Sequence, residues 1–266
     1  MKKRIWLIGG TSESKTIAIA IAKRGWPCTI SVTTKRAIAL YPKTPHLKII
    51  ARAIESELIG KFLVREQIIA IVDATHPHAV NISRGAIAAA NALKIPYLRF
   101  DREEIPGSLG DLKKEKAIQL DSFDTLLAGN YLLGKRVLLI VGCKILPRFQ
   151  VWQSRSTLFA RILPYPESLE IALDSGFSPD RIVAIRPPVS LELEKALWQQ
   201  WQISLIVNKA NGRVGGEDIK RVVASQLNVP SITIARPKVN YPQQTYNLDE
   251  VLSFCAARVA TASIIN

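Results

Sequence analysis

The chain has 266 residues, 48% hydrophobic and 22% charged, which are the proportions of a folded globular protein and exclude a disordered one. Its three cysteines lie far apart and form no C-x-x-C pair, so neither a disulfide scaffold nor a zinc site is expected. Its formal net charge of +14 calls for a strongly negative partner, unless the basic surface serves solubility alone.

The first residues, MKKR, resemble the start of a signal peptide, but the apolar run that follows ends at Ile8. No window contains the roughly 20 apolar residues that a membrane helix needs. We therefore expect a soluble, cytoplasmic protein, a monomer or weak homo-oligomer. Lys and Arg are spread along the chain without a basic arm, which favours a small anionic partner over nucleic acid.

The apolar pattern predicts alternating strands and helices in two series. Strands are expected near 4–8, 28–33, 47–50, 68–73 and 96–100, and then near 136–141, 157–163, 181–185, 203–207 and 231–235. Helices are expected near 13–24, 55–66, 78–93, 123–130, 167–175, 190–201, 216–227 and 248–262. Such alternation is typical of α/β folds with parallel sheets.

A polar segment at 101–116, rich in charge and containing Pro106, Gly107 and Gly110, interrupts this rhythm. We place a domain boundary there. The prediction is two Rossmann-like domains, 1–100 and 101–245, that face a central cleft, followed by a C-terminal helix, 246–266, that packs on one of them.

The first strand runs into a glycine turn, Gly9-Gly10, and then a polar helix start from Thr11 to Ser14. Such a turn brings backbone N–H groups and the positive end of a helix dipole to an anion, usually a phosphate. The dinucleotide fingerprint requires a third glycine, where this chain has Ser14 nearby. The motif alone leaves nucleotide binding and an ordinary turn equally open.

The second strand ends in Thr33, Thr34, Lys35 and Arg36, without the acid that holds the ribose hydroxyls of NAD. A turn of hydroxyls and cations there suits the 2′-phosphate of NADP. The alternative is a solvated surface loop.

The fourth strand delivers Asp73 to a turn that contains Thr75, His76, Pro77 and His78. Ligands of α/β sheets collect outside the carboxyl ends of the strands, so this turn is a candidate for chemistry. A capped helix start is the alternative reading. The two histidines could in principle bind a metal, but no further His or Cys cluster supports a site, and none is predicted.

Three strand exits of the second series each offer a cation, namely Lys144, Arg186 and Lys209. Several cations at one sheet edge are what a polycarboxylate would require. Ser190 accompanies Arg186, and a Gly215-Gly216 turn opens the helix after Lys209. A solvated lysine in an ordinary loop remains an alternative for Lys209.

Together these motifs resemble the precorrin-6A reductase family of cobalamin (corrin ring) synthesis. The matching segments are LIGGTSE at 7–13, VDATHP at 72–77, ISR at 82–84, PYLRFDR at 96–102, ARILP at 160–164, RPPVS at 186–190 and VNKANGRVGGE at 207–217. The chain departs from the family pattern at His78, at Pro187 to Ser190, at Asn208 to Gly212, and at Ala51 to Glu57, where the family has a glycine-rich stretch.

The resemblance implies NADPH-dependent reduction of precorrin-6A, an anionic tetrapyrrole, to precorrin-6B. Cobalt-precorrin-6A reduction with NADH is the nearer alternative, and a non-redox α/β protein that binds nucleotide or nucleic acid is the one of another class. The implied cofactor contacts are Gly9, Gly10, Thr11, Ser12, Glu13, Thr33, Lys35, Arg36, Asp73, Ala74, Thr75 and His76. The implied substrate contacts are Ser83, Arg84, Lys144, Arg186, Ser190, Lys209, Gly215 and Gly216. His76 and Lys209 are the catalytic candidates, with water equal to His76 as the proton donor.

Overall fold

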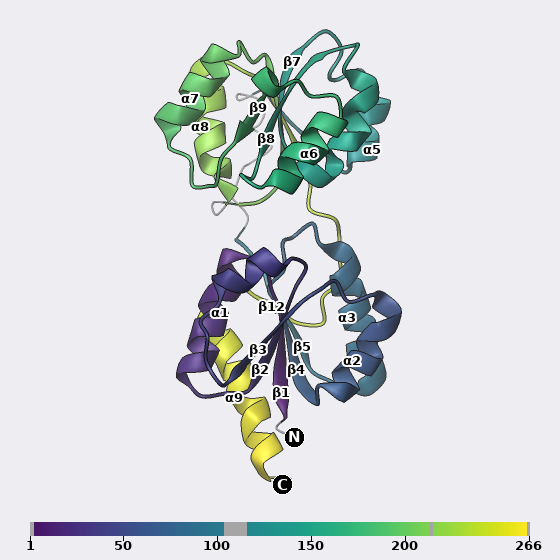
Figure 1. Ribbon diagram of the computed structural model, residues 1–266, viewed down its shortest axis with the longest axis vertical. Helices are drawn as coiled ribbons and strands as arrows, with labels where there is room; N and C mark the ends of the chain where they lie inside the picture. Colours follow the sequence, from purple (N-terminus) through teal and green to yellow (C-terminus); the bar gives the residue numbers. More distant parts are fainter. Residues whose placement is uncertain (1–2, 104–115, 213–214, 265–266) are drawn as a thin grey trace. The chain divides into compact units, whose positions relative to one another are not determined.

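The computed structural model describes residues 3–103, 116–212 and 215–264, which form two compact units (Figure 1). The first unit comprises Met1–Arg102 and Lys238–Asn266, and the second comprises Glu103–Pro237. Both are α/β, and each contains one six-stranded parallel sheet, so the predicted fold class is confirmed. None of the described helices is long and apolar enough to cross a membrane.

The first unit is built around the strand order β12-β5-β4-β1-β2-β3. Its strands are β1 (Arg4–Ile8), β2 (Cys28–Val32), β3 (Leu47–Ala51), β4 (Ile68–Asp73), β5 (Tyr97–Phe100) and β12 (Gln244–Thr245). Its helices are α1 (Ser12–Lys23), α2 (Ile59–Arg65), α3 (Val80–Leu93) and α9 (Leu248–Ile264), with the 3-10 segments η1 (Lys35–Leu40) and η2 (Ser56–Leu58).

The second unit has the order β6-β11-β10-β7-β8-β9. Its strands are β6 (Ala117–Leu120), β7 (Arg136–Ile140), β8 (Thr157–Ile162), β9 (Ile182–Ala184), β10 (Leu205–Lys209) and β11 (Ser231–Ile234). Its helices are α5 (Phe123–Ala128), α6 (Pro166–Asp174), α7 (Leu191–Gln200) and α8 (Glu217–Leu227), with η3 (Cys143–Trp152) and η4 (Pro179–Arg181).

Apolar side chains on both faces of each sheet are covered by helices. In the first unit, α1 and α9 pack on one face and α2 and α3 on the other (Figure 1). In the second unit, α5, η3 and α6 cover one face, and α7 and α8 cover the other. This double coverage explains why the central strands are nearly continuous apolar runs, as buried parallel strands are.

The two sheets share the order of five strands and differ in the edge strand, which comes last in the chain in the first sheet (β12) and first in the second (β6). In the first unit the strand order reverses beside β1, which lies between β2 and β4, and in the second it reverses beside β7, which lies between β8 and β10. Ligands of open α/β sheets bind in the crevice outside the carboxyl ends of the strands at such a switch point. Each unit therefore has one position where a site is expected.

Several elements differ from those predicted. The strands β6 and β12 were not predicted, because β6 follows the polar segment and β12 has only two residues, which pair with Arg99 and Phe100 of β5. The segment after β7 is a long 3-10 stretch that contains Pro147. Because β12 joins the first sheet, residues 238–245, which the sequence assigned to the second domain, belong to the first unit. Most of the polar segment 101–116 lies outside the described residues.

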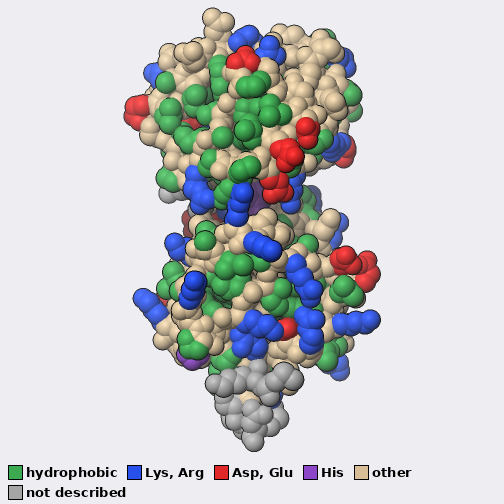
Figure 2. All heavy atoms as spheres, viewed as in Figure 1, with side chains coloured by type: hydrophobic (Ala, Val, Ile, Leu, Met, Phe, Trp, Pro, Cys, Tyr) green, Lys and Arg blue, Asp and Glu red, His purple; other side chains and the backbone are tan. Residues whose placement is uncertain are grey.

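Positive charge is unevenly divided between the units. Most of the excess of Lys and Arg over Asp and Glu lies in the first unit. On the face shown in Figure 2, Lys and Arg side chains spread over this unit, whereas the second unit exposes more apolar surface. The positive charge therefore lies mainly in the unit that carries the glycine turn.

Candidate functional site

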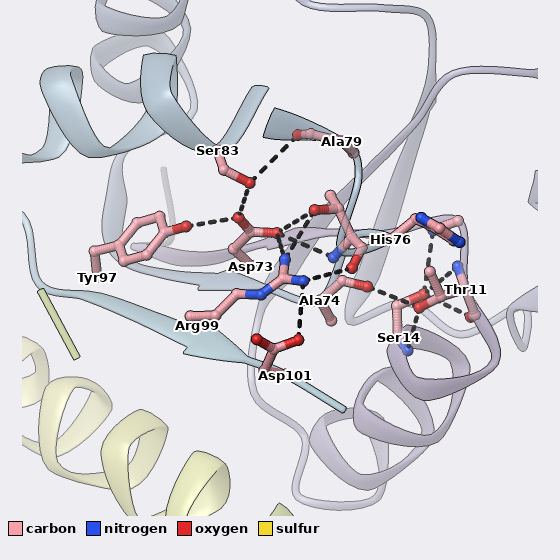
Figure 3. A network of polar contacts seen from close by, with 12 residues as sticks. Thr11, Ser14, Asp73, Ala74, His76, Ala79, Ser83, Tyr97, Arg99 and Asp101 are labelled. Carbon is pink, nitrogen blue, oxygen red and sulfur yellow. Dashed lines mark hydrogen bonds and ion pairs between the residues drawn. The ribbon is translucent and has the colours of Figure 1, made fainter. Parts of the chain in front are cut away.

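The glycine turn and the D-A-T-H-P turn meet at the switch point of the first unit. β1 and β4 are neighbours, and the N–H of Ala74 donates to the carbonyl of Ile8 at 3.0 Å. The Thr11 hydroxyl then donates to the carbonyl of Ala74 at 2.7 Å, which joins the two turns directly (Figure 3). The structure thus brings together two motifs that lie more than 60 residues apart in the chain.

The outer side of the glycine turn is open. Gly10 is exposed and has a φ of +106°, a conformation that favours glycine, and a Cβ there would have no atom within 4 Å. Thr11 caps α1, a helix of 12 residues whose positive dipole end lies at this turn. Ser12, the first helical residue, is exposed beside it. The outer side of the turn therefore has open space beside the positive end of a helix dipole.

The inner side of the turn is closed by the protein itself. The N–H of Gly9 donates to the Ser31 carbonyl at 2.9 Å. The N–H of Gly10 reaches the hydroxyls of Ser14 at 3.1 Å and Tyr41 at 2.8 Å, and the N–H of Thr11 reaches Ser14 at 3.0 Å.

These contacts change which backbone N–H groups of the glycine turn could receive a phosphate. Ser14, which stands near the position of the missing third glycine, uses its hydroxyl to occupy two of the N–H groups that were expected to receive a phosphate. The helix start at Ser12 is left as the candidate contact.

Glu13 is held by an ion pair. Its carboxylate lies 2.5 Å from Nε of Arg102, which also donates from Nη2 at 3.2 Å. Burial alone would raise the pKa of Glu13, but Arg102 reverses this effect and the pKa is lowered. Arg102 therefore offsets a negative charge that would otherwise repel an anion at the start of α1.

The Asp73 carboxylate is completely buried and accepts five hydrogen bonds (Figure 3). Oδ1 accepts from the N–H of Thr75 at 3.0 Å, its hydroxyl at 2.7 Å, and Arg99 at 2.9 Å. Oδ2 accepts from the hydroxyls of Ser83 and Tyr97, both at 2.6 Å. Burial and the neighbouring Asp73 raise the pKa of Tyr97, which stays a protonated donor.

This network corrects two expectations from the sequence. Asp73 and Ser83 have no acceptor or hydroxyl left for a ligand, because each is satisfied inside the protein. They instead fix the turn that carries Thr75 and His76.

Arg99 is the residue that sequence analysis missed. Only 1% of it is exposed, and besides Asp73 it donates to the hydroxyl and the carbonyl of Thr75 at 2.9 and 3.0 Å. The ring of Tyr241 lies 5.2 Å from its guanidinium carbon. Burial lowers the pKa of Arg99, but Asp73 more than reverses this, so the pKa is raised. The signal in the sequence was a charged residue in the middle of the short apolar strand at 96–100.

His76 lies half-buried on the turn that this network holds. Its Nδ1 accepts the N–H of His78 at 3.2 Å, and the two rings are 5.7 Å apart. Because Nδ1 is an acceptor, the proton of the neutral ring is assigned to Nε2. In this neutral form the Nε2–H can donate a hydrogen bond.

The exit of β2 carries the predicted cations. Thr33, Lys35 and Arg36 are exposed at the start of η1. No Asp or Glu occurs from residue 33 to residue 46. This cationic segment follows the strand next to β1, on the same sheet edge as the glycine turn.

At the switch point of the second unit, the exits of β7 and β10 bring Lys144 and Lys209 to one sheet edge. Lys209 is half-buried with Nζ 5.5 Å from the Phe123 ring, and burial lowers its pKa. Lys144 is exposed at the start of η3.

Three other expected contacts lie elsewhere. Arg186 follows the edge strand β9, two strands from β7, where its guanidinium bonds the Tyr165 hydroxyl. Ser190 caps α7 by accepting the N–H of Leu193 at 3.3 Å. Arg84 of the first unit is exposed and donates to the Lys238 carbonyl at 3.4 Å.

Gly215 and Gly216 have conformational roles. A Cβ on Gly215 would lie 2.3 Å from Cβ of Asn211, and Gly216 has a φ of +67° before α8. The N-terminus of α8 is occupied by a carboxylate of the chain, because Glu217 accepts the N–H of Gly212 at 3.0 Å.

A buried lysine lies beneath this turn. Lys220 is 3% exposed, donates to the Gly215 carbonyl at 2.6 Å, and has its pKa lowered to about 8, first by burial and then by Arg161. Arg161 itself is paired with the buried Glu194.

Known proteins resemble this chain over most of its length. The family model described as precorrin-6x reductase CbiJ/CobK matches residues 4–256. A cobalt-precorrin-6A reductase of Synechocystis sp. is 44% identical over 94% of this chain and 95% of its own, and one of Priestia megaterium is 30% identical over 93% and 96%. A solved structure of CobK precorrin-6A reductase has the same fold, with a TM-score of 0.76 and 23% identity over 97% of both chains. The chain belongs to the precorrin-6x reductase family.

Proposed function

We propose that this protein reduces precorrin-6A in corrin-ring synthesis, with NADPH bound by the first unit. The observation that carries the proposal is the meeting, at one switch point, of an open glycine turn, the D-A-T-H-P turn and a cationic strand exit without an acid. Family membership supports the reaction class.

The first unit is the better nucleotide site of the two. Its first strand leads through Gly10 into an α-helix, which supplies the dipole that favours phosphate. In the second unit, β7 leads into a 3-10 segment that contains Pro147. At the start of α8, the Glu217 carboxylate accepts the N–H of Gly212 and pairs with Arg221 at 3.1 Å.

The choice of NADPH over NADH rests on Thr33, Lys35 and Arg36. A charged hydrogen bond contributes roughly 1.5–3 kcal/mol, so two such bonds to a 2′-phosphate would give about a hundredfold preference or more. An acid at this position, which would favour NADH, is absent from residues 33–46.

Reduction of a conjugated double bond needs a hydride at one carbon and a proton at its neighbour. The nicotinamide cofactor supplies the hydride when bound. His76 is our candidate for the proton donor: as an imidazolium it would give a proton from Nε2 and return to the neutral ring, and its turn is held by the Asp73 network. In the second unit, Lys209 and Lys144 would bind carboxylates of the macrocycle.

Cobalt-precorrin-6A is the second candidate substrate. The relatives from Synechocystis sp. and Priestia megaterium both carry that name, whereas the CobK structure is named for precorrin-6A. The cobalt would enter as part of the substrate.

The decisive experiment is anaerobic incubation of the protein with precorrin-6A or its cobalt form, with absorbance followed at the nicotinamide band. We expect oxidation of one NADPH per macrocycle and binding of NADPH at least tenfold tighter than NADH. Equal affinities would contradict the cofactor choice. No oxidation with either substrate, together with salt-sensitive binding of nucleic acid, would favour a non-redox binding protein.

Replacement of Arg36 tests the cofactor contact directly. Arg36→Ala should weaken NADPH binding about tenfold and leave NADH binding unchanged, because only NADPH carries the 2′-phosphate. Lys61→Ala, which removes an exposed cation from α2, is the matched control. Equal weakening of both cofactors by Arg36→Ala would show that Arg36 does not read the 2′-phosphate.

A further inference from the structure

Tyr41 anchors the segment that carries the predicted 2′-phosphate cations. This residue follows η1 directly, and its N–H donates to the Ile38 carbonyl at 3.1 Å. Of the residues 33–46, which connect β2 to β3, Tyr41 alone is buried, with 5% of its surface exposed. The connection that bears Lys35 and Arg36 is therefore fixed to the core mainly through Tyr41, with Ala37 and Leu40 partly buried against the same core.

The hydroxyl of Tyr41 ends at the glycine turn. It accepts the N–H of Gly10 at 2.8 Å and lies 2.7 Å from the Ser14 hydroxyl, with which it shares a hydrogen bond. Burial raises the pKa of Tyr41, so this hydroxyl keeps its proton. The shorter of the two bonds from the Gly10 N–H is the one to Tyr41.

Gly9 shows how closely the hydroxyl approaches the turn. A Cβ built on Gly9 would lie 2.3 Å from the Tyr41 oxygen, inside any permitted contact. The same Cβ would lie 3.2 Å from Ile30 and 3.3 Å from Ser14. The first glycine of the turn therefore leaves room for the Tyr41 hydroxyl, whereas the second, Gly10, leaves room on the open outer side.

We propose that Tyr41 is a positioning residue for the cofactor, which holds the phosphate-binding turn and the Lys35-Arg36 segment at a fixed separation. The inference rests on the proposed NADPH site. A ligand that contacts both parts binds more tightly when their separation is fixed, because less conformational entropy of the protein is lost on binding. NADPH engages both parts, and NADH, which lacks the 2′-phosphate, engages only the turn.

Tyr41→Phe tests this inference, because it removes the hydroxyl and keeps the buried ring. We expect the dissociation constant for NADPH to rise about tenfold and that for NADH to change less than about threefold, so that the preference for NADPH falls. A purely structural role would shift both constants alike, which would overturn the inference. The matched control is Thr29→Val, which removes a buried hydroxyl from β2 of the same unit, away from both turns, and should leave the ratio of the two constants unchanged.

Direct titration of the unmutated protein separates this inference from the proposed function. Equal affinity for the two cofactors would contradict the proposed cofactor and this inference with it. A clear preference for NADPH that Tyr41→Phe leaves intact would overturn the inference alone. If Tyr41→Phe does not fold, Ser14→Ala takes its place. It removes one of the two partners of the Tyr41 hydroxyl and also changes the turn for both cofactors, so the readout is the ratio of the two constants, which should fall.

Discussion

Asp73 shows how burial determines the role of a side chain at this site. Its carboxylate has no exposed surface, and its ion pair with Arg99 is equally buried. A buried pair costs desolvation, which further hydrogen bonds offset, and here Thr75, Ser83 and Tyr97 supply them to the carboxylate. The pair therefore acts as a rigid support for the turn that carries His76.

Asp73→Ala should lower the free energy of unfolding of the first unit by about 3–5 kcal/mol, because the buried Arg99 would lose its closer counter-charge and keep the longer ion pair with Asp101 at 3.5 Å. The matched control is Asp124→Ala, which breaks the exposed ion pair with Arg148 and should cost about 1 kcal/mol or less. Urea unfolding of both variants measures the difference. Losses of similar size would show that the buried network contributes no more to stability than the exposed ion pair does.

Lys209→Ala should raise the Michaelis constant for the macrocycle roughly tenfold to a hundredfold, because one charged hydrogen bond contributes roughly 1.5–3 kcal/mol. Turnover and NADPH affinity should stay the same. Since burial lowers the pKa of Lys209, the unmutated protein should lose substrate affinity with rising pH earlier than an ordinary lysine would allow.

Steady-state kinetics beside an NADPH titration measures these effects, with Lys135→Ala, at the amino end of β7, as the control. A fall in turnover at saturating substrate would instead give Lys209 a part in the transition state. Unchanged kinetics would remove it from the site.

At the scale of elements, the functional geometry comes from a strand, a glycine turn and a helix start. The chain turns sharply between β1 and α1 because Gly10 adopts a positive φ, and Thr11 and Ser14 then form reciprocal caps. The turn is thereby fixed from the inside and left open on the outside.

Gly10→Ala should cost about 1–3 kcal/mol of stability through backbone strain and should weaken NADPH binding at least tenfold by placing a Cβ on the open outer side of the turn. Gly134→Ala is a matched control, because Gly134 also has a positive φ, +69°, and open space around its Cβ, but lies in the second unit. It should cost similar stability and leave NADPH binding intact. If Gly10→Ala folds and binds NADPH normally, the phosphates bind elsewhere.

At the scale of the whole molecule, the two units differ in how the chain builds them. The second unit is one continuous segment, whereas the first is completed by β12 and α9 after the chain returns at Lys238. Four core residues of the first unit, Val251, Leu252, Phe254 and Cys255, come from α9. Burial of a large apolar side chain contributes roughly 1.5–3 kcal/mol, so α9 contributes about as much as the net stability of a typical domain.

The fragment 103–237 should therefore unfold cooperatively when it is expressed alone, and the fragment 1–102 should not. Circular dichroism during urea unfolding of each fragment checks this. Cooperative unfolding of 1–102 would show that β12 and α9 are dispensable for the first core.

The sequence alone determined the α/β class, the two series of strands and both turn motifs of the first unit. These are local properties, because strand and helix periodicity, glycine turns and helix caps depend on residues a few positions apart. Lys35 and Arg36 could likewise be predicted to be exposed cations, because the charged segments that connect strands run over the protein surface.

The tertiary structure decided which polar groups face each other. Asp73 meets Arg99 from 26 residues away and Gly10 meets Tyr41 from 31, and β12 pairs with β5 only after the whole second unit has intervened. Such partners are determined by strand order and packing, which local sequence patterns do not specify. For this reason Asp73 looked like a ligand contact in the sequence and is a buried support in the fold, while Arg99 and Tyr41 became visible only once the chain had folded.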